Sequence, residues 1–350
     1  GELQRWDWSY YSNKLMQERY ALDDEMLKPY FKLENVQKGV FDLATRLYGI
    51  TFKEVNNIPL YHPEVKTYEV YDNDGSFLAV LYTDFFPRES KGGGAWMTQF
   101  RGQKMVDGKD QRPLVSLVMN FTKPTDTKPS LLTFNEVTTF LHEFGHALHG
   151  MFSKCTYGST SMDGVSRDFV ELPSQFMENY ALEKEWLDTW AVHYQTGEKI
   201  PQEYIDKIKK SSNFQAGYAS DRQLSFGMVD MAWHTITEPV TEPLADFEQR
   251  AMGKTEIMPL VKGSAFSPAF GHIFAGGYAA GYYGYKWAEV LDADAFSLFK
   301  QNGIFDKATA ESFRRNVLEK GASENPMTLY KRFRGQEPTV DALLERSGLK

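Results

Sequence analysis

His142-Glu143-Phe144-Gly145-His146 is the most informative stretch of this 350-residue chain. Its two histidines are four residues apart, and side chains at that spacing share one face of a helix, with Cβ atoms about 5–6 Å apart. Two imidazoles placed in this way can bind a single divalent metal ion. The surrounding positions 137–151 are largely apolar. The pattern therefore predicts a buried helix that carries two metal ligands.

Glu143 follows the first histidine directly, so its side chain is expected beside the metal rather than on it. A carboxylate there is suited to be the general base that takes a proton from the water that the metal activates. A catalytic zinc takes three protein ligands and leaves one position for water. His149 is the nearest further candidate, but it would crowd three ligands onto one helix. We expect His149 to lie at the surface or to contact a ligand instead.

A carboxylate from a second helix is the alternative source of the third ligand. The run 168–175 begins such a helix, with Pro173 in its first turns, where a missing N–H costs least. Glu171 and Glu178 are seven residues apart, two turns along one face. One can bind the metal while the other hydrogen-bonds a ligating histidine. The residues alone leave the choice among Asp168, Glu171 and Glu178 open.

Composition restricts the class of protein. Apolar residues make up 42% and charged residues 25% of the chain, the ordinary balance of a soluble globular protein. The net charge of −8 argues against a nucleic-acid partner, and no apolar run approaches the roughly 18 residues of a membrane span. Cys155, the single cysteine, fits a reducing compartment. We expect a cytoplasmic monomer, although the chain lacks an initiator methionine and is interpreted as a fragment.

The hydrophobic pattern predicts a mainly α fold with a small antiparallel β-sheet. A helix over 34–48 ends at Gly49, a C-cap position. Strands are expected at Lys66–Tyr71, Ser76–Tyr82 and Leu114–Phe121. Later helical patterns cover 131–152, about 169–195, 201–235, 242–252, 276–301 and 306–320. We expect residues 1–130 to form a helical segment plus the sheet, and residues 131–350 to form the helical catalytic core.

Four segments of the chain, in order, resemble the thimet-oligopeptidase-type zinc peptidases, most of all the bacterial peptidyl-dipeptidases (dipeptidyl carboxypeptidases) and oligopeptidase A. The segments are Trp6-Asp7-Trp8-Ser9-Tyr10-Tyr11, Phe140-Leu141-His142-Glu143-Phe144-Gly145-His146, Arg167-Asp168-Phe169-Val170-Glu171-Leu172-Pro173-Ser174-Gln175, and His272-Ile273-Phe274-Ala275-Gly276-Gly277-Tyr278 with its continuation to Tyr285. Chance is an implausible explanation for so many matches in this order.

The resemblance implies a zinc site and a fold. In that family the third ligand is the Glu that precedes the Pro-Ser-Gln run by one residue, which corresponds to Glu171. His142 and His146 would complete the ligand set of one Zn²⁺ per chain, and Glu178 would contact a ligating histidine. The fold implied is a multi-helix, zincin-like catalytic domain that forms one wall of a deep channel for short peptides. The opposite wall is a helical N-terminal half, which we expect to be absent from this chain.

Tyr278, Tyr282 and Tyr285 fall at i, i+4 and i+7, the spacing of one helix face. Four glycines between positions 276 and 284 are costly in a helix and suggest close backbone approach or a hinge. The resemblance implies that His272, Tyr278 and Tyr285 stabilise the developing oxyanion or hold the substrate backbone. Tyr282 is expected to contact substrate.

These features predict zinc-dependent hydrolysis of short peptides, with release of C-terminal dipeptides favoured over internal cleavage of the oligopeptidase A kind. A dipeptide-releasing enzyme needs a cation for the free carboxylate, and the sequence does not rank Arg101, Arg167, Arg222 and Lys286. From another class, the chain could be a non-catalytic peptide-binding module. The complete ligand set and the general base speak against that alternative.

Overall fold

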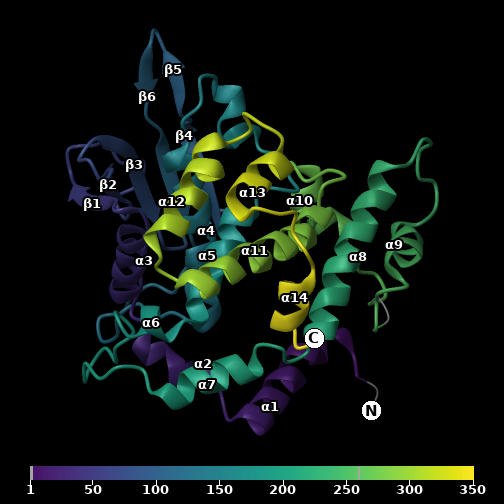
Figure 1. Cartoon of the computed structure of the whole chain (residues 1–350). Coiled ribbons are helices and arrows are strands. Elements are labelled where there is room, and N and C mark those ends of the chain that lie inside the picture. Colours follow the sequence, from purple (N-terminus) through teal and green to yellow (C-terminus); the bar gives the residue numbers. More distant parts are fainter. Residues whose placement is uncertain (1–2, 259–260) are drawn as a thin grey trace.

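The computed structural model describes residues 3–258 and 261–350 and is mainly helical (Figure 1). Among these residues no helix has both the length and the apolar character that crossing a membrane requires. The α-helices are α1 (Trp8–Tyr20), α2 (Asp24–Leu27), α3 (Leu33–Tyr48), α4 (Phe134–Phe152), α5 (Leu172–Glu178), α6 (Lys184–Leu187), α7 (Gln202–Ser211), α8 (Ala216–His234), α9 (Leu244–Met252), α10 (Gly271–Phe274), α11 (Tyr283–Asn302), α12 (Lys307–Asn316), α13 (Pro326–Arg334) and α14 (Asp341–Arg346).

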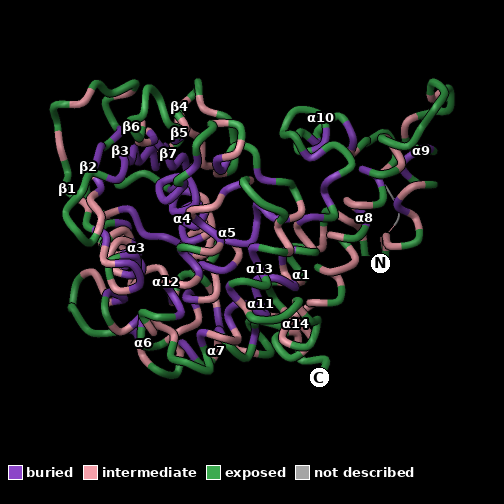
Figure 2. Tube along the Cα trace, turned by 45° about the horizontal axis from the view of Figure 1, so that its top comes forward, coloured by how far each residue is buried: buried purple, intermediate pink, exposed green. Residues whose placement is uncertain are grey.

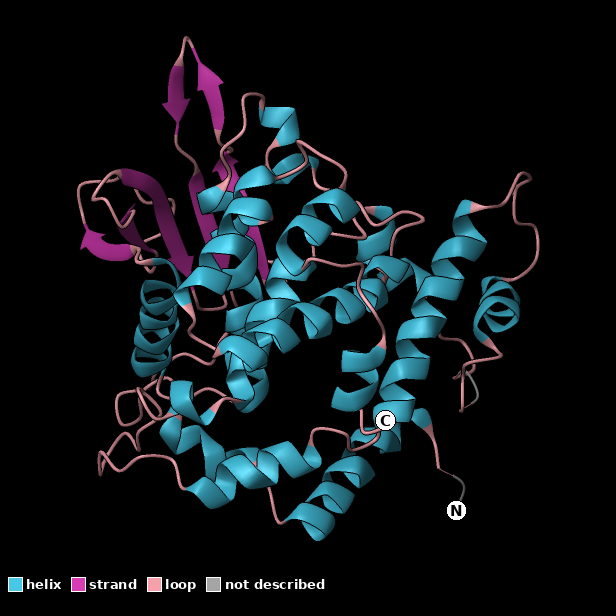
Figure 3. Cartoon of the chain, viewed as in Figure 1, coloured by secondary structure: helices cyan, strands magenta, loops and turns pink. Residues whose placement is uncertain are grey.

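The strands lie together at one corner of the molecule (Figure 3). A five-stranded sheet has the order β1-β2-β3-β7-β4, and a separate hairpin pairs β5 with β6. The strands are β1 (Thr51–Val55), β2 (Lys66–Tyr71), β3 (Phe77–Asp84), β4 (Trp96–Arg101), β5 (Lys104–Val106), β6 (Lys109–Gln111) and β7 (Leu114–Val118).

The three predicted strands are present as β2, β3 and β7, and the sheet differs from the prediction in one respect. The pair β3–β7 is parallel, with Val80 opposite Leu114, while the other pairs are antiparallel. The sheet is therefore mixed. The chain crosses over through β4, β5 and β6 before β7 returns beside β3, and β7 pairs with β4 on its other side. Strand β4, whose residues lack a regular alternation, and strands β1, β5 and β6 were not predicted from the sequence.

Helix α4, which carries the two histidines, lies in the interior of the fold. Its N-terminus is a capping box: Thr133 Oγ1 accepts from the Glu136 N–H at 3.1 Å, and Glu136 Oε2 accepts from the Thr133 N–H at 2.8 Å. The helix packs against α5 and against β7 and β4. Figure 2 shows buried chain concentrated around α4 and α5. A rigid, desolvated helix thus presents the histidines.

Gly145 explains how α5 comes so close to α4. A Cβ atom at this position would lie 2.3 Å from the Pro173 carbonyl oxygen and 2.6 Å from the Ser174 Cα. Any larger residue would push the two helices apart. The glycine between the two histidines therefore lets the segment that contains Glu171 reach them.

One core cluster includes residues from both sides of position 130, from Leu22 to Phe333. The helix over 34–48 is confirmed as α3, and Gly49 at its end has φ = 76°. Three longer helical predictions are wrong in extent. The pattern over 169–195 is divided into α5 and α6, that over 201–235 breaks before Gln215 at φ = 55°, and that over 276–301 begins as a helix only at Tyr283. The division of the chain into 1–130 and 131–350 stays a prediction.

Candidate metal centre and its tyrosine segment

Two imidazoles and one carboxylate converge between α4 and α5. The Nε2 atoms of His142 and His146 lie 3.2 Å and 3.1 Å from Glu171 Oε2. One donor atom from each residue lies within 4.8 Å of the other two. Two imidazole nitrogens and one carboxylate oxygen match the donors that zinc takes in catalytic sites. The chemistry and the spacing of this cluster therefore fit a divalent metal ion.

The carboxylate of Glu171 reaches both imidazoles. It is 2% exposed, at the N-cap of α5. Ser174 Oγ donates to its Oε2 at 2.8 Å, and the Tyr278 hydroxyl donates to its Oε1. Burial opposes ionisation, but the two imidazoles outweigh it and hold the pKa of Glu171 well below its usual range. Asp168, the competing candidate, instead accepts from the Tyr283 hydroxyl at 3.1 Å.

Glu178 orients the ring of His142. Its Oε1 lies 2.6 Å from His142 Nδ1, so that nitrogen donates and Nε2 faces Glu171. Burial lowers the pKa of His142, but hydrogen bonds to Glu171 and Glu178 raise it well above its ordinary value overall. For His146, no described residue hydrogen-bonds the buried Nδ1. The two histidines therefore differ in how firmly their rings are held.

Glu143 is 7% exposed and lies on α4 between the two histidines. Burial raises the pKa of its carboxyl above the usual value, although the two nearby imidazoles act in the opposite direction. The backbone of Met97, in β4, lies close enough to lower this pKa slightly. Glu143 is not among the three clustered donors. Its placement beside the cluster leaves it available for proton transfer.

The tyrosines gather near this cluster, but not on one helix face as predicted. Tyr278 and Tyr282 precede α11, which begins at Tyr283. The rings of Tyr278 and Tyr285 still stack with centroids 4.9 Å apart, and Tyr282 lies 5.0 Å from Tyr285. The exposed His272 has its ring 5.9 Å from Tyr282 and 6.2 Å from Tyr285. The residues meet because the backbone turns through the left-handed region at positions 277 and 280, which a regular helix excludes.

Burial keeps these phenols protonated. It raises the pKa of Tyr282 to about 12 and that of Tyr278 and Tyr285 further still. The neighbouring Glu171 charge adds to the effect at Tyr278 and Tyr285. All three hydroxyls are therefore hydrogen-bond donors at neutral pH.

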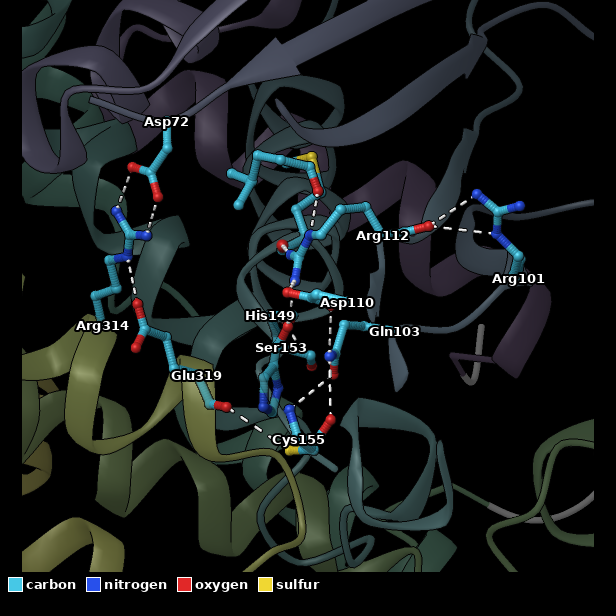
Figure 4. Close-up of polar contacts among 12 residues, drawn as sticks. Asp72, Arg101, Gln103, Asp110, Arg112, His149, Ser153, Cys155, Arg314 and Glu319 are labelled. Atoms are coloured by element: carbon cyan, nitrogen blue, oxygen red, sulfur yellow. Dashed lines mark hydrogen bonds and ion pairs between the residues drawn. The ribbon is translucent and has the colours of Figure 1, made fainter. Parts of the chain in front are cut away.

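His149 is not at the surface. It is fully buried, and burial lowers the pKa of its imidazole to about 3. Neither ring nitrogen has a hydrogen-bond partner among the described residues. Figure 4 shows the side chains near it, in which Gln103 and Arg112 tie the chain around Cys155 and Ser153 to the β5–β6 hairpin. His149 therefore packs as a neutral side chain at the end of α4, and of the two placements expected for it the one at the surface is wrong.

The four candidate cations differ in their neighbours. The Arg167 guanidinium lies 4.9 Å from the centre of the Tyr278 ring, and its Nε donates to the Gly277 carbonyl at 3.1 Å. Arg222 lies over the Phe226 ring, Lys286 pairs with Glu289 and Arg101 donates to the Arg112 carbonyl. Arg167 is thus joined to the metal cluster through Tyr278.

Ser174, which hydrogen-bonds Glu171, was not predicted from the sequence, although its i+3 spacing from Glu171 indicates a contact.

Comparisons with known proteins agree with this geometry. The family model described as "Peptidase family M3" matches residues 1–349. Oligopeptidase A of Escherichia coli (strain K12) is 46% identical over 100% of this chain and 52% of its own length. Dipeptidyl carboxypeptidase of Salmonella typhimurium is 42% identical over 99% of this chain and 51% of its own. The chain thus spans about half the length of these relatives.

A solved structure titled "The Structure of CHT" has a TM-score of 0.51 to this chain and 13% sequence identity, covering 99% of this chain and 66% of its own. At that identity the likeness concerns the fold alone. The match of the family model over almost the whole length carries the assignment. This chain belongs to peptidase family M3.

Proposed function

We propose that this chain is the metal-holding part of a zinc peptidase that releases C-terminal dipeptides from short peptides. The observation that carries the proposal is the convergence of His142, His146 and Glu171 on one point. Glu143 lies on α4, the helix that carries the two histidines. Membership of a peptidase family makes peptides the substrate class. Zinc is favoured over harder ions because two of the three donors are imidazole nitrogens.

In this proposal, His142, His146 and Glu171 would hold a zinc ion, which would supply the Lewis-acid chemistry that activates water and the scissile carbonyl near neutral pH. Glu143 takes the proton of the attacking water and passes it to the leaving amine. Glu178 holds the His142 ring, and Ser174 holds the Glu171 carboxylate. The hydroxyl of Tyr285, with His272, donates to the oxyanion or to the substrate backbone, and Tyr278 would join them by turning its hydroxyl from Glu171 to the substrate. Tyr282 contributes a substrate contact.

The free edge of strand β4 is a second observation in favour of a peptide substrate. β4 is the last strand in the order β1-β2-β3-β7-β4, so one of its edges is unpaired within the described residues. The backbone of Met97, on this strand, lies near Glu143. An extended peptide that adds to such an edge makes main-chain hydrogen bonds with little demand on its sequence. A peptide on β4 would therefore pass beside the proposed general base.

Release of C-terminal dipeptides requires capture of a free carboxylate, and Arg167 is the best placed of the four candidate cations. It is exposed and lies against Tyr278. The names of the relatives include both an oligopeptidase and a dipeptidyl carboxypeptidase, so internal cleavage is the competing outcome.

A single free cysteine, buried at Cys155, favours a reducing compartment, and we propose a cytoplasmic monomer.

Mass spectrometry of the products from one defined peptide tests the proposal. We expect release of dipeptides from the peptide with a free C-terminus, and little cleavage of the same peptide with an amidated C-terminus. Treatment with a chelator should abolish cleavage, and added zinc should restore it. Equal cleavage of the two peptides at internal bonds would replace the dipeptidase by an oligopeptidase. Peptide binding without chelator-sensitive cleavage would leave a non-catalytic module.

Tyr285→Phe is expected to lower kcat by about 10²–10³-fold with little change in KM, because a donor to the oxyanion acts in the transition state. Steady-state kinetics on the same peptide measures both constants. Tyr61→Phe is a matched control, since Tyr61 hydrogen-bonds Asp84 in the sheet region. A change confined to KM would make Tyr285 an ordinary substrate contact.

A further inference from the structure

Asp230 is a buried carboxylate in α8 that the mechanism above does not use. It is 0% exposed. Its Oδ1 accepts from the Ala280 backbone N–H at 2.9 Å, and its Oδ2 accepts from the Tyr282 backbone N–H at 2.9 Å. His234, one turn further along α8, donates from Nδ1 to Oδ1 at 2.7 Å. Both carboxylate oxygens therefore bind the backbone just before α11.

The bound segment, residues 275–282, has a conformation that its own sequence does not favour. Ala280 has φ = 52°, in the left-handed region that residues with a Cβ rarely adopt. The two N–H groups that flank this turn, at positions 280 and 282, both point to one carboxylate. Hydrogen bonds to an ionised acceptor are stronger than neutral ones. Asp230 thus stabilises a turn that would otherwise relax.

The same segment also contacts Arg167, whose guanidinium lies against the Tyr278 ring. Arg167 Nε donates to the Gly277 carbonyl at 3.1 Å. A Cβ atom at Gly277 would lie 2.8 Å from the Arg167 guanidinium, so the two are in close contact. Between these two anchors Tyr278 donates its hydroxyl to Glu171. A continuous series of contacts therefore runs from Asp230 through the turn to a metal-cluster residue.

We propose that Asp230 is a positioning residue that holds segment 275–282 in the conformation which places the Tyr278 hydroxyl on Glu171 and the Tyr282 ring against Tyr285. Figure 1 shows α8 on the opposite side of α11 from the sheet. Asp230 thus acts at a distance, through the backbone and not through contact with substrate. The kinetic consequences of this role rest on the proposed function, whereas its structural consequences do not.

Amide hydrogen exchange on the unmodified chain is the first test. Ala280 is exposed and outside any helix, so its amide should exchange fast unless a hydrogen bond protects it. We expect slow exchange at the amides of Ala280 and Tyr282, and faster exchange at one of them at least in Asp230→Asn, because its amide keeps one acceptor oxygen and turns its NH₂ towards the other backbone N–H. Fast exchange at both amides in the unmodified chain overturns the proposal, whether or not the variant folds.

Kinetics and metal affinity are the second test, with Glu248→Gln as the matched control. Glu248 is also 0% exposed and accepts from two backbone N–H groups, those of Phe266 and Ser267, but these lie outside segment 275–282. We expect Asp230→Asn to lower kcat or zinc affinity by about 10–100-fold, the range for residues that orient a metal site. We expect Glu248→Gln to lower only the melting temperature. Equal kinetic losses in both variants would show a general folding defect and refute the role of Asp230.

A double mutant separates positioning from other effects. Tyr278→Phe removes the hydroxyl that contacts Glu171. In that background, Asp230→Asn should lower kcat or zinc affinity clearly less than it does in the unmodified chain. Additive losses would mean that Asp230 does not act through Tyr278. If the chain cleaves no peptide but its Ala280 and Tyr282 amides are protected, the proposed function fails while the positioning of the segment by Asp230 stands.

Discussion

Glu143→Gln should retain one bound zinc and lose about 10²–10⁴-fold in kcat, the range that a general acid–base group contributes. The amide keeps the size of the carboxylate but cannot accept a proton at neutral pH. Metal should remain because Glu143 is not one of the three clustered donors. Elemental analysis after dialysis gives the zinc content, and hydrolysis of a defined peptide gives kcat.

Glu136→Gln is the matched control on the same helix. Glu136 closes the capping box of α4 from its first turn, and glutamine serves equally in that motif. We expect normal zinc content and normal turnover in this variant. If Glu143→Gln kept substantial activity while Glu136→Gln behaved normally, proton transfer would have to be assigned to another residue.

Glu171→Gln is expected to lower zinc affinity by at least about 100-fold, more than the loss of a residue that only orients a ligand. The amide is neutral, so it gives up the charge attraction between the carboxylate and the cation, while Ser174 can still hydrogen-bond its oxygen. Titration against a chromophoric chelator measures the affinity directly. Loss of activity should follow from loss of metal and be partly restored by excess zinc.

Glu178→Gln gives the graded comparison. Glu178 contacts His142 Nδ1 and lies outside the three clustered donors, so we expect a smaller loss of zinc affinity, about 10-fold. Full zinc occupancy in Glu171→Gln, under conditions that strip the metal from His146→Ala, would place the third ligand elsewhere. A larger effect at Glu178 than at Glu171 would exchange their roles.

Local periodicity in the sequence predicted several helices and strands of this protein correctly. His142 and His146 share a helix face because backbone geometry alone puts positions i and i+4 side by side. Helix α3 with Gly49 at its end, and strands β2, β3 and β7, followed from patterns within 20 residues or fewer. For the same reason the regular pattern of the tyrosines misled: it takes no account of the turn at Ala280, which Asp230 stabilises from a distant helix.

The amino-acid sequence by itself determined the helix with its two imidazoles, the carboxylate of Glu143 beside them, and a mainly α fold with a small sheet. Helix spacing left open which acid meets both histidines, and the family resemblance implied Glu171. The tertiary structure brings Glu171 to them, because the approach of α5 to α4 depends on the space left at Gly145. It also decided the burial of His149, the parallel pairing of β3 with β7 and the meeting of the tyrosines. These features depend on contacts between residues far apart in the chain. Tertiary packing stabilises those contacts, and no local sequence pattern predicts it.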